Sequence, residues 1–137
     1  MKAIARRREG YTHDVEIEGR HRLVIDEPEA AGGNDEGPSP TRAVAGALAA
    51  CTAITCEMYA ARKGWELGAL EVEVEAELDK RASFVSCTVT LRVPMPLDEE
   101  QEEKLLVIAG KCPVHRALAG ETPIEITDRI ASTSAAG

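Results

Sequence analysis

Apolar and polar residues alternate from Tyr11 to Ile17, and a short apolar run follows from Leu23 to Ile25. The pair Glu18-Gly19 lies between them, and alternation around such a turn is typical of a β-hairpin. Residues 29–40 then hold three glycines and two prolines, a composition that predicts a loop. The glycine spacing does not match the dinucleotide-binding fingerprint. The first forty residues therefore predict extended chain, with a hairpin and then a turn.

A long helix is predicted after this loop. Ser39 is a good N-cap and Pro40 suits a first helical position, while Gly64 marks the end after Lys63. Polar residues gather near the helix ends, so the middle is apolar on nearly every side, and we expect this helix to be central and covered all round. A stripe of small residues lets a sheet or a second helix approach closely: Gly46, Ala49 and Ala53.

Strict alternation returns in residues 70–78, where glutamates separate the apolar positions, and again in 85–93. This period of two predicts two adjacent antiparallel strands, the first with a solvated acidic face and no metal cluster. Pro94 and Pro96 end the second strand.

The last part of the chain predicts two helices and a strand. Asp98 and Gln101 form a capping box for a helix that Gly110 closes. A short helix is expected from Cys112-Pro113 to Gly120, and Ile124 with Ile126 predicts a final strand. Residues 131–137 are expected to form a flexible tail. Strands, a buried helix, strands, helices and a strand make an α+β fold, which we assign to one domain, 1–137.

Composition and charge narrow the class of protein. The chain has 137 residues, 44% of them hydrophobic, and a net charge of −8. An acidic chain with four aromatic residues lacks the basic patches and stacking platforms that bind nucleic acid, so we expect no nucleic-acid partner. The longest apolar run, residues 43–54, falls short of the roughly 20 residues that cross a bilayer, and no signal sequence is evident. We therefore expect no membrane partner and a cytoplasmic location.

Cysteine is the residue type with the strongest case for chemistry. The chain has four, Cys51, Cys56, Cys87 and Cys112, too few for a secreted disulfide scaffold. Cys51 and Cys56 lie five residues apart in one helix, about 8 Å between Cα atoms, which excludes a disulfide between them. Cys87 lies on the apolar side of its strand and is expected to be a buried, inert thiol.

Helix-end chemistry singles out Cys112 as the most reactive thiol. A cysteine before proline at a helix start meets free amide groups, and Lys111 and His115 add positive or proton-accepting groups. The same position also fits a simple helix cap. A zinc site of Cys51, Cys56, Cys112 and His115 is a rival, although the spacings do not match those of structural zinc sites. We predict no cofactor and no metal.

Two motifs around two cysteines resemble the OsmC/Ohr family of thiol-dependent organic hydroperoxide reductases. The matching segments are GPSPTRAVAGALAACTA (37–53), MYAARKGW (58–65) and KCPVHRAL (111–118). The resemblance implies an OsmC-like fold with antiparallel sheets around a long buried central helix, and an intertwined homodimer with active sites at the subunit interface. It further implies that Cys51 is the peroxidatic thiolate and that Cys112 resolves it as a disulfide. A dithiol such as a lipoylated protein or thioredoxin would return the electrons.

One position departs from the family pattern. Hydroperoxide-specific members carry a glutamate after the proline that begins the cysteine helix, whereas this chain has Thr41. Glu36 or Glu57 would have to supply the carboxylate, with Arg8 as the activating arginine and His115 as a further supporting group. Two other hypotheses stay open: a small-molecule binding module of the same fold without turnover, and the zinc protein.

Overall fold

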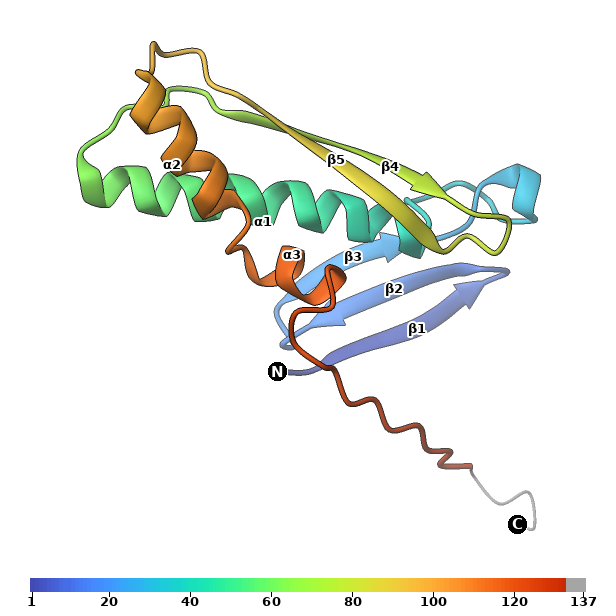
Figure 1. The fold of residues 1–137 in the computed structure, drawn as a ribbon. Coiled ribbons are helices and arrows are strands. Elements are labelled where there is room, and N and C mark those ends of the chain that lie inside the picture. Colours follow the sequence, from blue (N-terminus) through green and yellow to red (C-terminus); the bar gives the residue numbers. More distant parts are fainter. Residues whose placement is uncertain (133–137) are drawn as a thin grey trace.

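The computed structural model describes residues 1–132 and has a long helix across its middle (Figure 1). In chain order the elements are β1 (Ala3–Glu9), β2 (Thr12–Ile17), β3 (His21–Ile25), the 3₁₀ turn η1 (Glu29–Ala31), α1 (Pro40–Lys63), β4 (Glu71–Leu78), β5 (Phe84–Arg92), α2 (Glu99–Ala109) and α3 (Pro113–Leu118). The mixed order with antiparallel strands confirms the predicted α+β class. Of the tail predicted at 131–137, residues 133–137 lie outside the described part.

Strands β1, β2 and β3 form an antiparallel sheet in that order. The predicted hairpin is β2–β3, in which Val15 pairs with Leu23, and β1 adds a third strand through the pairing of Ala5 with Val15. A β-bulge interrupts the β1–β2 ladder near Glu9, where the pattern of paired positions shifts. The sheet is thus a three-stranded meander whose first strand precedes the predicted alternation.

Helix α1 has the predicted bounds because its local signals are strong. The Ser39 side chain accepts a hydrogen bond from the Arg42 amide (3.3 Å), and Pro40 occupies the first turn. At the other end Gly64 adopts a left-handed conformation (φ 70°), and its amide donates to the last helical carbonyls.

The prediction that α1 is covered on every side is wrong for the single chain, which buries only one side of this helix. Its buried residues are a single row spaced four apart: Leu48, Thr52, Cys56 and Ala60. On another face Ile54 and Met58 are 50% and 63% exposed. The reason is that β4, α2 and α3 pack on one side of the helix, whereas β1, β2 and β3 pack mainly on each other.

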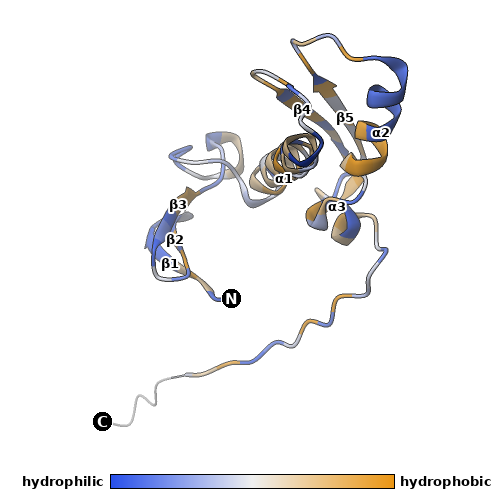
Figure 2. Cartoon of the chain, turned by 90° about the vertical axis from the view of Figure 1, so that its left-hand side faces the viewer, coloured by the Kyte–Doolittle hydropathy of each residue, from blue (hydrophilic) through white to orange (hydrophobic). Residues whose placement is uncertain are grey.

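Figure 2, which looks nearly along α1, shows this separation of layers, with the β1–β3 sheet on one side of the helix and the other elements across from it. Helix α1 is also long and apolar enough to cross a membrane by length and composition alone. The core helix of a soluble protein meets the same criteria.

The β4–β5 hairpin is antiparallel, with Val74 opposite Val89. As predicted, the glutamates of β4 are exposed: Glu71, Glu73, Glu75 and Glu77. The core joins α1 to α2 and the segments around the hairpin through a buried cluster: Cys56, Ala60, Leu67, Leu105, Ile108 and Ala109. Burial of this cluster sets the position of α2 on α1.

Helices α2 and α3 begin as predicted. Asp98 and Gln101 form both hydrogen bonds of a capping box (2.7 and 3.0 Å). The strand predicted at Ile124 and Ile126 is wrong, because residues 121–132 have no strand assignment, and both isoleucines are exposed. A strand needs a neighbouring strand to pair its amides, and no strand of the described chain pairs with this segment.

Candidate active site

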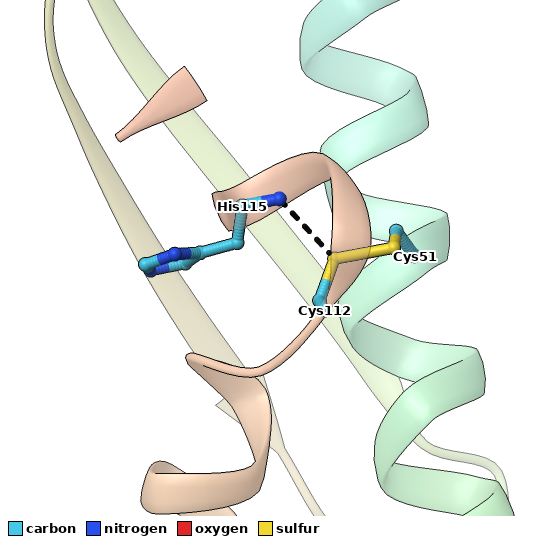
Figure 3. The surroundings of a disulfide bond; sticks show 3 residues. All are labelled: Cys51, Cys112 and His115. Carbon is cyan, nitrogen blue, oxygen red and sulfur yellow. Dashed lines mark hydrogen bonds between the residues drawn. A yellow bond between two sulfur atoms is a disulfide. The ribbon is translucent and has the colours of Figure 1, made fainter. Parts of the chain in front are cut away.

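Two cysteines from distant parts of the sequence meet beside the middle of α1. Cys51 and Cys112 are 61 residues apart in sequence, yet their Cα atoms are 5.9 Å apart and their sulfurs are joined in a disulfide (Figure 3). This Cα separation lies within the range that a disulfide allows. The structure thus brings together the pair that the family resemblance implied.

The packing of α2 on α1 explains how Cys112 reaches Cys51. Leu105, Ile108 and Ala109 bury one face of α2 against the core. A tight turn follows, in which the Cys112 amide donates to the Ala109 carbonyl (3.4 Å). Cys112 is then the N-cap of α3, and Pro113 takes the first helical position.

The two disulfide-bonded cysteines differ in solvent exposure. Cys112 is fully buried, with 0% exposure, whereas Cys51 is partly exposed. The Sγ atom of Cys112 accepts a hydrogen bond from the His115 amide (3.5 Å). Figure 3 shows that this contact uses the backbone nitrogen, while the His115 ring points away from the sulfurs. Of the two residues, only Cys51 therefore has solvent-accessible surface in the single chain.

A cleft of about 250 Å³ is lined in part by Leu48 and His115, each of which lies three residues along the chain from one of the two disulfide-bonded cysteines. Its lining comes from α1, β5 and the α3 region: Leu48, Phe84, Val85, Ser86, Cys87, Val89, His115, Leu118 and Ala119. Most of these side chains are apolar, and Nδ1 of His115 is buried without a hydrogen-bond partner among the described residues. The cleft suits an apolar group that carries few polar atoms.

The other two cysteines occupy different settings. Cys56 is fully buried on the face toward α2, and its thiol donates to the Leu105 carbonyl (3.8 Å). Burial, together with the nearby Glu57 carboxylate, raises the pKa of the Cys56 thiol, so it stays protonated and unreactive. Cys87 is exposed, so the expectation that it is buried is wrong. Cys87 lines the cleft, together with residues of α1 and α3, so its side of β5 is not filled by packed side chains.

The predicted supporting residues lie in two places. Arg8 forms ion pairs with Asp14 (2.7 Å) and Glu36 (3.0 Å) on the β1–β3 sheet. The hydrogen bond to Asp14 is the main cause of the raised pKa of Arg8, and in return it lowers the pKa of Asp14. No hydrogen bond or ion pair within residues 1–132 joins Arg8 or Glu36 to Cys51. Glu57 lies beside Cys56, not at the disulfide.

A buried carboxylate that sequence reasoning missed holds the loop before α1. Asp26 is 1% exposed and accepts hydrogen bonds from the Thr12 hydroxyl (2.7 Å) and from three loop amides, those of Glu27, Asn34 and Glu36. Burial alone would raise the pKa of Asp26, but these hydrogen bonds outweigh it and lower the pKa. The available signal was an aspartate at a strand end before a glycine-rich loop.

The four ligands of the zinc hypothesis do not gather. The disulfide holds Cys51 and Cys112, while Cys56 faces α2. Across residues 1–132 there is no group of three or more His, Cys, Asp or Glu side chains placed to hold a metal ion.

Comparisons with known proteins lead to OsmC-like proteins and organic hydroperoxide resistance proteins. A family model described as "OsmC-like protein" matches residues 32–127. A solved OsmC-like protein from Mycoplasma pneumoniae has 18% identity and a TM-score of 0.75, and the match covers 87% of this chain and 86% of that one. The organic hydroperoxide resistance protein OhrB of Bacillus subtilis has 26% identity and a TM-score of 0.56, with 88% and 92% covered.

A third solved structure, an organic hydroperoxide resistance protein from Legionella pneumophila, has 24% identity and a TM-score of 0.61, with 88% of this chain and 90% of that chain covered. No curated protein matches the sequence.

Proposed function

Because this chain belongs to the OsmC-like protein family, we propose that it is a two-cysteine thiol peroxidase that reduces organic hydroperoxides in defence against peroxide stress. The observation that carries the proposal is the Cys51–Cys112 disulfide, in which Cys51 is partly exposed and Cys112 is fully buried. Leu48, one helical turn before Cys51, lines an apolar cleft. An attacking thiol needs access to substrate, whereas a resolving thiol needs access only to its partner.

The reaction has two steps on the protein. The Cys51 thiolate attacks the outer oxygen of the hydroperoxide, the O–O bond breaks, and the alkoxide takes up a proton and leaves as an alcohol. Cys51 is then a sulfenic acid. The thiolate of Cys112 attacks its sulfur, hydroxide leaves and takes up a proton to become water, and the disulfide of Figure 3 forms. A dithiol reductant, such as a lipoylated protein or thioredoxin, returns two electrons.

The cleft supports an organic substrate over hydrogen peroxide. Leu48, Phe84 and Val89 offer an apolar surface to an alkyl or aryl group, and burial of that group contributes binding energy that hydrogen peroxide lacks. We therefore propose apolar hydroperoxides as substrates.

A homodimer is the second part of the proposal. In a single chain, Ile54 and Met58 of α1 are 50% and 63% exposed. The strands of the β1–β3 sheet contact mainly one another and leave this face of α1 uncovered. Exposed apolar surface on a central helix is typical of an interface. We propose that a second copy covers α1 and that its Arg8 and Glu36 then lie near this chain's Cys51, where a cation favours the thiolate. Sedimentation of the wild type at the monomer mass of 14.7 kDa would contradict this assembly.

The first experiment measures consumption of cumene hydroperoxide with dihydrolipoamide as the reductant. We expect Cys51→Ser to abolish turnover and Cys112→Ser to lower it strongly while a sulfenic acid accumulates on Cys51. Cys87→Ser is the matched control, because this thiol lines the cleft but stands outside the disulfide. Hydrogen peroxide should be the poorer substrate. A wild type without turnover would rule out the peroxidase.

A complementation experiment tests the role of Arg8. Arg8→Ala should lower turnover on the order of tenfold, since a lost cation lowers the thiolate fraction of Cys51. Arg6→Ala is the control, because Arg6 lies on the same strand as Arg8 but pairs with Glu16 of β2 (2.8 Å). Mixed dimers of Arg8→Ala chains with Cys51→Ser chains should regain activity, since one site then holds both groups. Failure to regain it would place Arg8 and Cys51 in one chain's own site, or Arg8 outside the reaction.

A binding module of the same fold is the alternative that the cleft also supports. It predicts that cumyl alcohol binds to the wild type and to Cys51→Ser equally, with no peroxide consumed.

A further inference from the structure

A buried carboxylate anchors the loop that leads into α1. Asp26 directly follows β3 and is 1% exposed. Its Oδ2 atom accepts hydrogen bonds from the Thr12 hydroxyl (2.7 Å) and from the Glu36 amide (3.2 Å). Its Oδ1 atom accepts from the amides of Glu27 (2.7 Å) and Asn34 (3.4 Å). The backbone of Glu36 is therefore tied from the inside to the end of β3.

Backbone contacts close the same loop. The Asp26 amide donates to the Pro38 carbonyl (3.1 Å), and the Asp35 amide donates to the Glu27 carbonyl (3.0 Å). Gly33 lies so close to the Glu27 backbone that a Cβ atom on Gly33 would overlap the carbonyl. The loop therefore has little room to shift unless its hydrogen bonds to Asp26 break.

The side chain of Glu36 extends from this loop to the guanidinium of Arg8. Its Oε2 atom accepts a hydrogen bond from Arg8 Nη1 (3.0 Å). Asp14 of β2 accepts from Nε (3.3 Å) and Nη2 (2.7 Å) of the same guanidinium. A planar guanidinium that carboxylates hold on two edges has a fixed orientation. The sheet positions Asp14, whereas the loop positions Glu36.

From this series of contacts we infer that Asp26 is a positioning residue, which holds the backbone of Glu36 and through Glu36 fixes the orientation of Arg8. The inference deepens the proposed function, on which its meaning for the reaction rests, because there the Arg8 of a second copy favours the Cys51 thiolate. The hydrogen bonds of Asp26 go to Thr12 and to loop amides, so Asp26 acts through other residues and not on the sulfur.

Burial makes this anchor effective. Water competes poorly for the hydrogen bonds of a carboxylate with 1% exposure, and a charged acceptor binds an amide more strongly than a neutral one. The same hydrogen bonds lower the pKa of Asp26 although burial opposes them, so the carboxylate stays charged at neutral pH.

Asparagine in place of Asp26 should release Glu36 selectively. A side-chain amide keeps one acceptor oxygen and has an NH₂ group in place of the other. Oδ1 meets the backbone amides of Glu27 and Asn34, which only donate, so the asparagine oxygen should stay there. The NH₂ group then takes the Oδ2 position, where the Thr12 hydroxyl can turn to accept but the Glu36 amide cannot.

The first test is a double-mutant cycle on turnover of cumene hydroperoxide. Asp26→Asn and Glu36→Gln should each lower kcat/KM by about threefold to tenfold, and the double variant should lose no more than the larger single loss. Effects of independent sites would multiply instead.

Thr12→Val is the matched control. It removes a hydrogen bond to the same carboxylate (2.7 Å) but leaves the Glu36 amide its acceptor. Thr12→Val should therefore lower the urea midpoint, as Asp26→Asn does, and keep the wild-type kcat/KM. A loss of turnover that follows stability in both variants would overturn the inference.

The second test uses no peroxide. Nitrogen-15 NMR of the full chain records the guanidinium N–H signals of Arg8, which Arg8→Lys assigns. In Asp26→Asn these signals should move to their positions in Glu36→Gln, whereas Thr12→Val should leave them unchanged. Signals of Arg8 that stay at the wild-type positions in Asp26→Asn would overturn the inference.

The two tests separate the positioning role from the proposed function. A wild type without turnover would remove the peroxidase, and the NMR measurement would still decide whether Asp26 positions Arg8. An active wild type whose losses multiply in the double variant would keep the peroxidase and overturn the positioning role. If Asp26→Asn does not fold, Gly33→Ala displaces the same loop while Asp26 remains, and the same turnover and NMR outcomes apply.

Discussion

Reduction of the Cys51–Cys112 disulfide should destabilise the fold by about 4 kcal/mol, and this value comes from the length of the loop that the bond closes. The cysteines are 61 residues apart. For a loop of 61 residues the chain-entropy relation gives about 14 cal/mol/K, or about 4 kcal/mol at 25 °C. The loop contains the C-terminal half of α1, the β4–β5 hairpin and α2, so its closure restricts the unfolded chain over almost half of its length.

This free energy corresponds to a large thermal shift. Unfolding of a 137-residue chain carries an entropy of about 290 cal/mol/K by size scaling, so about 4 kcal/mol lowers the melting temperature by about 14 °C.

The assay is urea unfolding of the oxidised and the reduced wild type, followed by circular dichroism. It is run at one fixed protein concentration, because the stability of the proposed dimer would depend on concentration. Cys87→Ser should show the same difference between oxidised and reduced forms as the wild type. The double variant Cys51→Ser, Cys112→Ser should unfold identically with and without reductant. The difference in unfolding midpoint, multiplied by the slope, gives the free energy.

Equal midpoints for oxidised and reduced wild type, with the disulfide verified by mass, would refute the loop-closure reasoning. A shift that persists in the double variant would show that the reductant acts elsewhere, and the value could not then be assigned to this bond.

Three further predictions concern the scaffold. Because the pKa of Asp26 is lowered, its carboxylate stabilises the fold above the ordinary aspartate pKa of 3.8, and this stabilisation is lost as the pH falls through the lowered pKa. Asp26→Asn should therefore lower the urea midpoint at neutral pH. The midpoint of this variant should also fall less steeply in acid than that of the wild type. Gly37→Ala would drive a Cβ atom into the Val24 carbonyl oxygen and should lower the melting temperature. Gly46→Ala meets no atom of its own chain within 4 Å and should raise stability by up to about 1 kcal/mol in calorimetry. Leu105→Ala removes a buried contact between α2 and α1 and should cost about 2–5 kcal/mol in urea unfolding, together with slower disulfide formation in a timed alkylation assay.

Elements whose ends carry local signals were predictable from the sequence. Ser39 with Pro40 begins α1 and Gly64 ends it, because capping groups act on amides and carbonyls within one turn. The capping box of α2 and the alternation of β4 and β5 are local in the same way. Strand β1 was not singled out, since its basic run, residues 6–8, hides the alternation that identifies a strand.

Errors arose where burial depends on distant parts of the chain. Alternation placed Cys87 on the apolar face of its strand, but only the fold decides whether a helix covers that face, and here a cleft lies over it. The apolar middle of α1 predicted full coverage, yet one chain covers one side. The isoleucines at 124 and 126 have a strand pattern without a strand to pair with.

The sequence by itself determined the identities and local settings of the two key cysteines, one in mid-helix and one before a proline at a helix start, because these follow from neighbours within a turn. Only the tertiary structure decided that their Cα atoms lie 5.9 Å apart, that Cys112 is fully buried while Cys51 is partly exposed, and that Arg8 pairs with Asp14 and Glu36. Distances across 61 residues are set by how α2 packs on α1, and packing depends on shape and burial, which no local pattern contains.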